Sequence, residues 1–369
     1  MLSDSERSWL RLHLTPGLGR QGLFQLFSHF GSADKALQSG TSSWPQKLGR
    51  RRAESFTLLT ADDPLFLSAI KTLESCQAQI VSFWDPDYPA DLKSIHDPPA
   101  LLYVCGRLPS AAALAVVGSR KASEAGIDLT SRICYELAGL GIVIVSGLAR
   151  GIDSAAHRAA IEAGGLTIAV LGCGIDRIYP PENRRLFQQI AATGAIISEY
   201  PPGTEPLPGH FPGRNRIISG LSKGVLIVEA ARKSGSLITA DFALEQGREV
   251  FAIPGAVSAT NSDGVNSLLK DGAHLVTETR DITDLLWPQS PSAPFTAAKV
   301  VCLELSQKEF IVAEQLDSNP LHIDDLSRKS GLTPMELSVI LLQLEIRGAV
   351  IQLPGMRYVR SHQTVRTAT

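Results

Sequence analysis

Seven short apolar runs, separated by stretches with helix signals, constrain the fold of this chain more than any other feature. The runs occupy residues 114–118, 142–147, 167–172, 195–200, 224–230, 249–255 and 274–278. They are apolar throughout rather than alternating, as expected for strands whose two faces are both covered by helices. Helix-capping residues begin the stretches between them, for example Asp153 or Ser154, and Ser234 or Ser236. This alternation predicts an α/β fold with a doubly wound parallel sheet.

The segments on either side of this sheet have a different character. Residues 1–98 are mostly helical in pattern, and the Pro-Gly-Leu-Gly turn at 16–19 is either a helix-hairpin-helix that touches DNA phosphates or a simple tight turn. Pro288, Pro291 and Pro294 stand at every third position and predict a stiff, extended linker. The helices and strands expected after this linker follow the order of a winged helix. We therefore predict a helical domain at 1–98, the α/β domain at 99–286, the linker at 287–299, a winged-helix domain at 300–360 and a tail at 361–369.

The composition narrows the classes of function. The net charge is only −2, so a nucleic-acid partner would have to be bound by a local positive field. The five cysteines lie far apart without a C-x-x-C pair, which argues against a zinc site and a disulfide framework and fits a reducing cytosol. No apolar stretch approaches the roughly 18 residues that indicate a membrane span, and the acidic first residues do not resemble a secretory signal. We therefore predict a cytoplasmic protein without membrane insertion.

The strand ends predict where a ligand binds. In a doubly wound sheet the ligand crevice lies beyond the carboxyl ends of the strands. Glycine there lets the backbone approach a ligand, and arginine offers donors matched to phosphate oxygens. In the alternative, these arginines are buried and form ion pairs with Asp153 or Asp176. The residues at the ends of the first two strands of the α/β domain are Gly118, Ser119, Arg120, Ser146, Gly147 and Arg150.

The string FPGRNR at 211–216 is the richest in nucleic-acid-binding side chains. An aromatic ring beside guanidinium groups suits an exposed base next to a phosphate, and stacking contributes about 1–3 kcal/mol per base. In the alternative, Phe211 fills the core and Arg214 or Arg216 pairs with a carboxylate. The candidates in this string are Phe211, Arg214, Asn215 and Arg216. A second anion cradle is predicted at the start of the next helix, from Lys233, Ser234, Gly235, Ser236 and Thr239.

Catalytic and cofactor signatures are not convincing in this sequence. The glycines at 118 and 172–174 lack the G-x-G-x-x-G spacing, and no P-loop motif occurs. His157 and His210 have no partner at a zinc-ligand spacing. Glu229, at a strand end, is either a general acid or base or, as we favour, a carboxylate that orients an arginine. We therefore predict no catalytic residue, no metal and no cofactor.

Strings at seven places resemble the DNA-processing protein A family, also called DprA or Smf. They lie at 118–120, 145–157, 169–183, 197–203, 211–222, 228–255 and 263–273. The resemblance implies an extended Rossmann domain that binds single-stranded DNA, forms a homodimer through that domain and loads RecA during natural transformation. It also implies a sterile-alpha-motif-like helical domain before it and, in many relatives, a winged helix after it. The family's DNA pocket falls on Gly118, Ser119, Arg120, Ser146, Gly147, Phe211, Arg214, Asn215 and Arg216.

Two departures from the family and one unusual helix qualify this prediction. Relatives often have Arg where Gly213 stands and some have Lys where Pro208 stands, so a weaker or more salt-sensitive grip is expected. The would-be recognition helix at 334–347 carries two glutamates and only Arg347 as a base. A major-groove reader presents cationic and amide side chains to the DNA. Our hypothesis is that this winged helix docks on protein rather than on duplex DNA.

Two other classes of function share features with this sequence. The first is a nucleotide-processing enzyme of the phosphoribohydrolase type, which has a similar sheet and phosphate-binding turns. Its P-G-G-x-G-T-x-x-E signature is absent, because the matching stretch at 234–241 lacks the Glu in register. The second is a winged-helix transcription regulator with a ligand-sensing domain, against which the acidic recognition helix argues.

Overall fold

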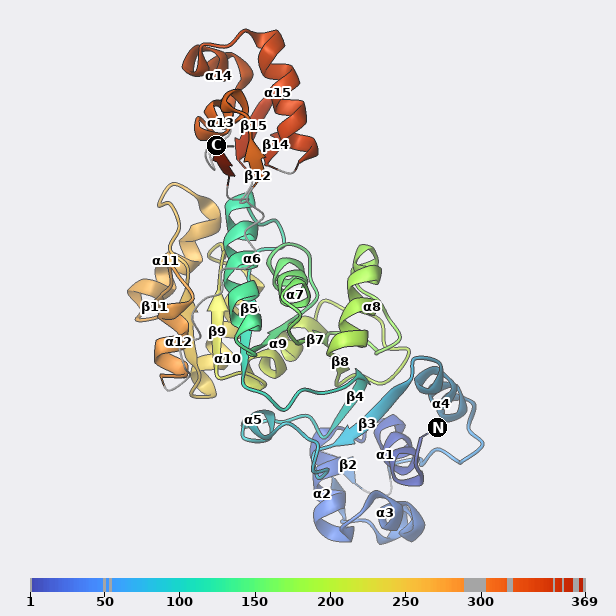
Figure 1. Ribbon diagram of the computed structural model, residues 1–369. Helices are drawn as coiled ribbons and strands as arrows, with labels where there is room; N and C mark the ends of the chain where they lie inside the picture. Colours follow the sequence, from blue (N-terminus) through green and yellow to red (C-terminus); the bar gives the residue numbers. More distant parts are fainter. Residues whose placement is uncertain are drawn as a thin grey trace. The chain divides into compact units, whose positions relative to one another are not determined.

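A computed structural model describes residues 2–48, 51–52, 55–288, 303–316, 321–347, 349–353, 355–360 and 365–367. The chain divides into two compact units, 1–288 and 289–369. The first unit holds a central sheet, drawn from cyan through yellow to orange in Figure 1, and the second is drawn in red. The described residues contain no helix that is both long and apolar enough to cross a membrane.

The central sheet confirms the predicted doubly wound α/β fold. Among the described residues it has nine strands in the order β11-β10-β9-β5-β6-β7-β8-β4-β3. All neighbours from β11 to β8 run parallel. The seven predicted strands are β5 (Ala113–Val117), β6 (Val143–Ser146), β7 (Thr167–Leu171), β8 (Ala195–Ser198), β9 (Gly224–Ile227), β10 (Glu249–Ala252) and β11 (His274–Leu275).

Helices cover both faces of this sheet, which explains why its strands are apolar throughout. One face packs against α6, α7 and α12, and the other against α5, α9, α10 and α11. Helices that follow β5 and β9 therefore lie on opposite faces, and the crevice between these two strand ends stays open. The bounds are α5 (Ala90–Lys93), α6 (Glu124–Gly139), α7 (Ile152–Glu162), α8 (Arg184–Thr193), α9 (His210–Gly220), α10 (Gly235–Glu245), α11 (Asp263–Lys270) and α12 (Arg280–Leu286).

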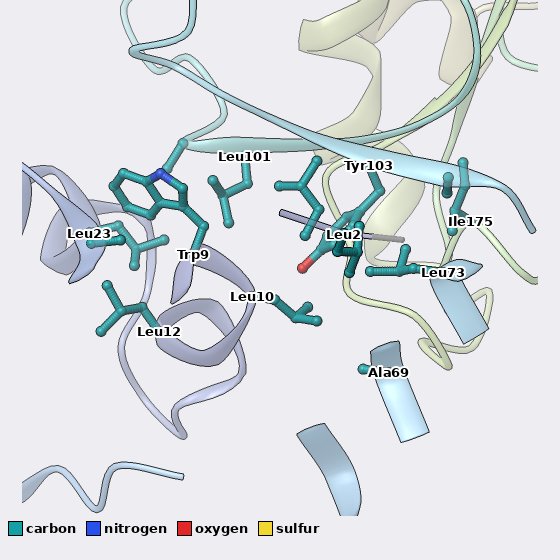
Figure 2. Close-up of a cluster of buried hydrophobic side chains, with 14 of the residues drawn as sticks. Leu2, Trp9, Leu10, Leu12, Leu23, Ala69, Leu73, Leu101, Tyr103 and Ile175 are labelled. Carbon is teal, nitrogen blue, oxygen red and sulfur yellow. The ribbon is translucent and has the colours of Figure 1, made fainter. Parts of the chain in front are cut away.

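The N-terminal segment is helical as predicted, and the central sheet extends into it across the predicted boundary at residue 98. Strand β3 lies before that point and β4 after it, and the two pair antiparallel in the central sheet. Leu10 of α1 and Leu73 of α4 share a core with Leu101 and Tyr103 of β4 (Figure 2). The elements here are α1 (Asp4–Leu14), α2 (Arg20–Phe30), α3 (Ala33–Ser39), β1 (Lys47–Leu48), β2 (Arg51–Arg52), α4 (Pro64–Ser75), β3 (Ala78–Ser82) and β4 (Leu101–Gly106).

The second unit is the predicted winged helix, with its own apolar core. The predicted tail at 361–369 needs one correction, because β16 pairs parallel with β12. Of the predicted linker, residues 289–299 lie outside the described residues. The elements are β12 (Leu303–Leu305), α13 (Gln307–Glu314), β13 (Leu321–His322), α14 (Ile323–Ser330), α15 (Pro334–Ile346), β14 (Val350–Leu353), β15 (Arg357–Arg360) and β16 (Val365–Thr367).

Candidate nucleic-acid interface

A cavity of about 740 Å³ lies at the carboxyl ends of β5 and β9. Its walls come from the loop after β5, the start of α9 and the start of α10. The predicted residues that line it are Gly118, Ser119, Arg120, Phe211, Arg214, Asn215, Lys233, Ser234, Gly235, Ser236 and Thr239. A smaller hollow shares Arg120, Phe211 and Arg214 with this cavity and adds Gly147 and Arg150.

Two of the cationic side chains of the cavity lie against the ring of Phe211. The Cζ atoms of Arg120 and Arg214 lie 5.5 and 5.9 Å from the centre of its ring. Tyr179 adds a second ring, 5.6 Å from the first between centroids. Both rings are accessible, and Arg120 is exposed. An aromatic face flanked by guanidinium groups provides a stacking surface beside donors for phosphate.

Arg214 is held differently from Arg120, since only 4% of its surface is exposed. Its Nη1 donates to the carbonyl of Gly147 at 2.7 Å and also to that of Val170, and its Nε donates to Oδ1 of Asn215 at 3.2 Å. Burial lowers the pKa of Arg214 and raises that of Asp153, and the attraction between the two charges opposes both shifts. Arg214 therefore ties α9 to the ends of β6 and β7 and lends positive potential to the cavity.

The loop after β6 is shaped to receive this guanidinium group. Asp153 accepts hydrogen bonds from the backbone N–H groups of Gly147 and Ala149, at 3.1 and 3.3 Å. A Cβ added at Gly147 would lie 2.5 Å from Cζ of Arg214. A larger residue here would therefore force the buried guanidinium group of Arg214 to move.

Two predicted residues do not reach the cavity. Arg216 pairs with Glu199 at 2.6 Å and with Asp97 at 3.0 Å, so the alternative that it pairs with a carboxylate is the right one. The reason is helical: residues two apart on α9 point about 200° apart, and Arg214 takes the inward position. Ser146 is buried and donates to the carbonyl of Val116 at 2.6 Å, so it links β6 to β5. Neither residue lines the cavity or the smaller hollow.

Arg150 lies on the smaller hollow and is exposed, but it is already paired with a carboxylate. Its Nε donates to Glu182, which raises the pKa of Arg150 and lowers that of Glu182. A phosphate would have to compete with this ion pair, which is weak because both side chains are in solvent.

The residues of the predicted second cradle lie at the start of α10, on the wall of the cavity. Ser234 is the N-cap of this helix and accepts a hydrogen bond from the N–H of Ser236 at 3.4 Å. Nδ2 of Asn215 donates to the carbonyl of Gly235 at 3.1 Å, so α9 and α10 are tied together at the cavity wall. The first turn of a helix offers free N–H groups to an anion.

Glu229 holds the loop that carries Arg120. It accepts hydrogen bonds from the N–H of Ser123 at 3.0 Å and from the Ser123 hydroxyl. The expectation that it orients an arginine therefore needs refinement, because it contacts the N-cap of α6 in the arginine loop rather than the guanidinium group.

Sequence reasoning missed about half of the cavity wall, including the polar or aromatic residues Tyr179, Lys121 and Asn261. Tyr179 follows no strand, and only its aromatic character beside two prolines marked it. Lys121 directly follows Arg120, and Asn261 donates to the Lys121 carbonyl at 3.3 Å. Among the described residues, no group of three or more His, Cys, Asp or Glu side chains is arranged to hold a metal ion.

Comparison with known proteins assigns the family. A family model described as DNA recombination-mediator protein A matches residues 79–286. Protein Smf of Synechocystis is 34% identical over 98% of this chain and 100% of its own length. The chain belongs to the DprA/Smf family. DprA of Streptococcus pneumoniae is 49% identical over 54% of this chain and 72% of its own length. A model described as the DprA winged helix domain matches residues 300–356.

Solved structures of DprA proteins share this fold. The X-ray structure of DprA from Streptococcus pneumoniae matches with a TM-score of 0.63 and 36% identity, over 78% of this chain and 99% of that one. DprA of Helicobacter pylori, whose structure gives insight into a single-stranded DNA binding mode, matches with a TM-score of 0.52 and 32% identity, over 58% of this chain and 97% of that one.

Proposed function

We propose that this DprA-family chain binds single-stranded DNA in the cavity at the ends of β5 and β9, without catalysis. The observation that carries the proposal is the placement of Arg120 and Arg214 within 6 Å of the Phe211 ring. Bases of a duplex are stacked on one another, whereas an unpaired base offers a free face to such a ring. The single-stranded DNA binding reported for the Helicobacter relative supports the same reading.

The wider role follows from the family resemblance. We propose that the chain acts in the cytoplasm as a homodimer formed through the Rossmann domain, and that it loads RecA onto the bound strand during natural transformation and homologous recombination. RecA filament growth on single-stranded DNA, followed with and without the protein, tests the loading step. Growth that is no faster with the protein would contradict it.

Binding of a fluorescent single-stranded oligonucleotide, followed by anisotropy across a salt series, tests the site. Arg120→Ala is expected to weaken binding about tenfold and to reduce the salt slope by about 0.7, the value for one phosphate contact. Phe211→Ala is expected to lose about 1–3 kcal/mol of stacking. Arg158→Ala is the matched control, because Arg158 is an exposed arginine of α7 that does not line the cavity.

The control separates site binding from general electrostatics. Arg120→Ala and Arg158→Ala change the net charge equally, so an equal loss of affinity in both would remove the cavity from the proposal. The rival function, a phosphoribohydrolase-like enzyme, is tested by incubating the protein with AMP. We expect no free adenine, and its release in proportion to protein concentration would favour the enzyme.

A further inference from the structure

Helix α15 of the winged helix has two apolar faces, and only one of them is used by its own core. Leu337, Ile340, Leu341 and Leu344 are buried against the rest of the unit. On the other face, Met335, Val339, Leu342 and Ile346 are exposed by 82%, 56%, 57% and 78%. We call these four exposed residues the α15 ridge. A continuous apolar row of this kind on a soluble protein marks an interaction surface.

The spacing of the α15 ridge favours a helix as its partner. Its residues follow one another at intervals of four, three and four, which is the pattern of an a/d seam in a coiled coil. At about 100° per residue they fall within a sector of roughly 60°. This sector is narrow and straight, as required for two helices that pack side by side.

The same spacing suits a second copy of α15 as the partner. The sequence of intervals reads the same from either end, so two antiparallel copies place Met335 opposite Ile346 and Val339 opposite Leu342. A two-fold axis requires a surface that is complementary to itself in this manner.

The charged residues beside the ridge are compatible with this pairing. Ser338 and Glu345 flank it on one side, and Glu336 and Gln343 on the other. In the antiparallel arrangement Glu345 meets Ser338 of the second copy, and Glu336 meets Gln343 of the second copy. Each acid therefore faces a neutral polar residue, and like charges are not opposed.

Duplex DNA fits this surface poorly. A helix in the major groove needs donors for bases and phosphates, whereas the exposed face of α15 is apolar and its side chains flanking the ridge are acidic or neutral. Arg347, at the C-cap, pairs with Glu309 at 3.4 Å. We propose that the winged helix self-associates through antiparallel packing of the α15 ridge against the same ridge of a second copy.

This inference goes beyond the proposed DNA binding and does not depend on it. Sedimentation equilibrium of the full chain, without DNA, tests it up to a few hundred micromolar. Leu342→Glu places an acid in the seam twice, once from each copy, and is expected to raise the dissociation constant of the ridge-dependent step about a hundredfold or more. Ile351→Glu is the matched control, since Ile351 is an exposed apolar residue of β14 outside the ridge, and it should leave that step unchanged.

Cysteine cross-linking tests the orientation. Residues 335 and 346 lie about 16 Å apart along one helix, too far for a disulfide, which needs Cα atoms within about 7 Å. A mixture of Met335→Cys and Ile346→Cys chains should cross-link to each other far faster than either does to itself. Self-cross-linking of each variant would indicate a parallel pair and overturn the proposal. The proposal would also be overturned if Leu342→Glu left the sedimentation mass unchanged and the cysteine variants cross-linked no faster than the parent chain. This holds even if the ridge then proves to bind another protein.

Discussion

Replacing Gly147 by alanine tests how the binding loop is built. The backbone at this position is not left-handed, so alanine adds no backbone strain. Its Cβ would instead lie 2.5 Å from Cζ of Arg214 and closer still to both Nη atoms. The guanidinium group would have to move and give up its bonds to the Gly147 and Val170 carbonyls. Hydrogen bonds to a charged group are worth about 1.5–3 kcal/mol each, so we expect a loss of about 3–6 kcal/mol in the free energy of unfolding.

The assay can be confined to the unit that carries the cavity. All four tryptophans lie within residues 1–288, so urea denaturation followed by tryptophan fluorescence reports on this unit alone. Gly139→Ala is the control, because a Cβ at this position in α6 meets no atom within 4 Å. It should be neutral or slightly stabilising.

A double-mutant cycle isolates the cause. Arg214→Ala removes the group that the new methyl would displace, so adding Gly147→Ala to that variant should cost little more. The same cycle should appear in oligonucleotide binding, because Arg214 also sits against the Phe211 ring. Two results would contradict this explanation: Gly147→Ala unfolding at the same urea concentration as the parent, or the losses of stability in the two single variants simply adding in the double variant. Either would show that Gly147 is not needed to make room for the guanidinium group.

Two further predictions concern charge. Pro208 lines the cavity and is exposed, so Pro208→Lys should tighten single-stranded DNA binding at low salt and steepen its salt dependence by about 0.7; an unchanged slope would show that strand and lysine do not meet. Burial, aided by Arg214, lowers the pKa of His157 to about 3. Below pH 6.5, the ordinary pKa of histidine, His157 is therefore protonated in the unfolded chain but not in the folded chain. As the pH is lowered, this residue should reduce the free energy of unfolding by about 1.4 kcal/mol per pH unit. His157→Gln should make the decline between pH 6.5 and pH 5 shallower by that amount, and equal slopes would contradict the assignment.

The central strands could be predicted because burial on both faces leaves a continuous apolar signal. Strand β3 was not predicted, because Ala78–Ser82 begins only three residues after the end of α4 and carries two polar residues, Gln79 and Ser82. It also pairs with β4 across the predicted boundary, a long-range contact that no local pattern announces.

The cavity could be predicted as a set of strand ends, but not residue by residue. Arg214 and Arg216 carry the same chemistry, and only the start of α9 at His210 decides which of them faces inward. The carboxylates that form ion pairs with Arg216 belong to Asp97 and Glu199, which are not its neighbours in the sequence. The apolar side chains of α15 were visible from the start, yet which four are exposed depends on how the helix seats on its core.

The walls of the cavity come from stretches of chain as far apart as Gly118 and Asn261. None of these stretches forms a binding surface by itself. The surface therefore exists only when the whole sheet is folded. Bound single-stranded DNA must then also stabilise the elements that it does not touch. At a free DNA concentration of a hundred times the dissociation constant, the stabilisation is about 2.7 kcal/mol. Occupancy by an unlabelled oligonucleotide can thus be followed from the far side of the unit, as slower proteolysis at sites remote from the cavity.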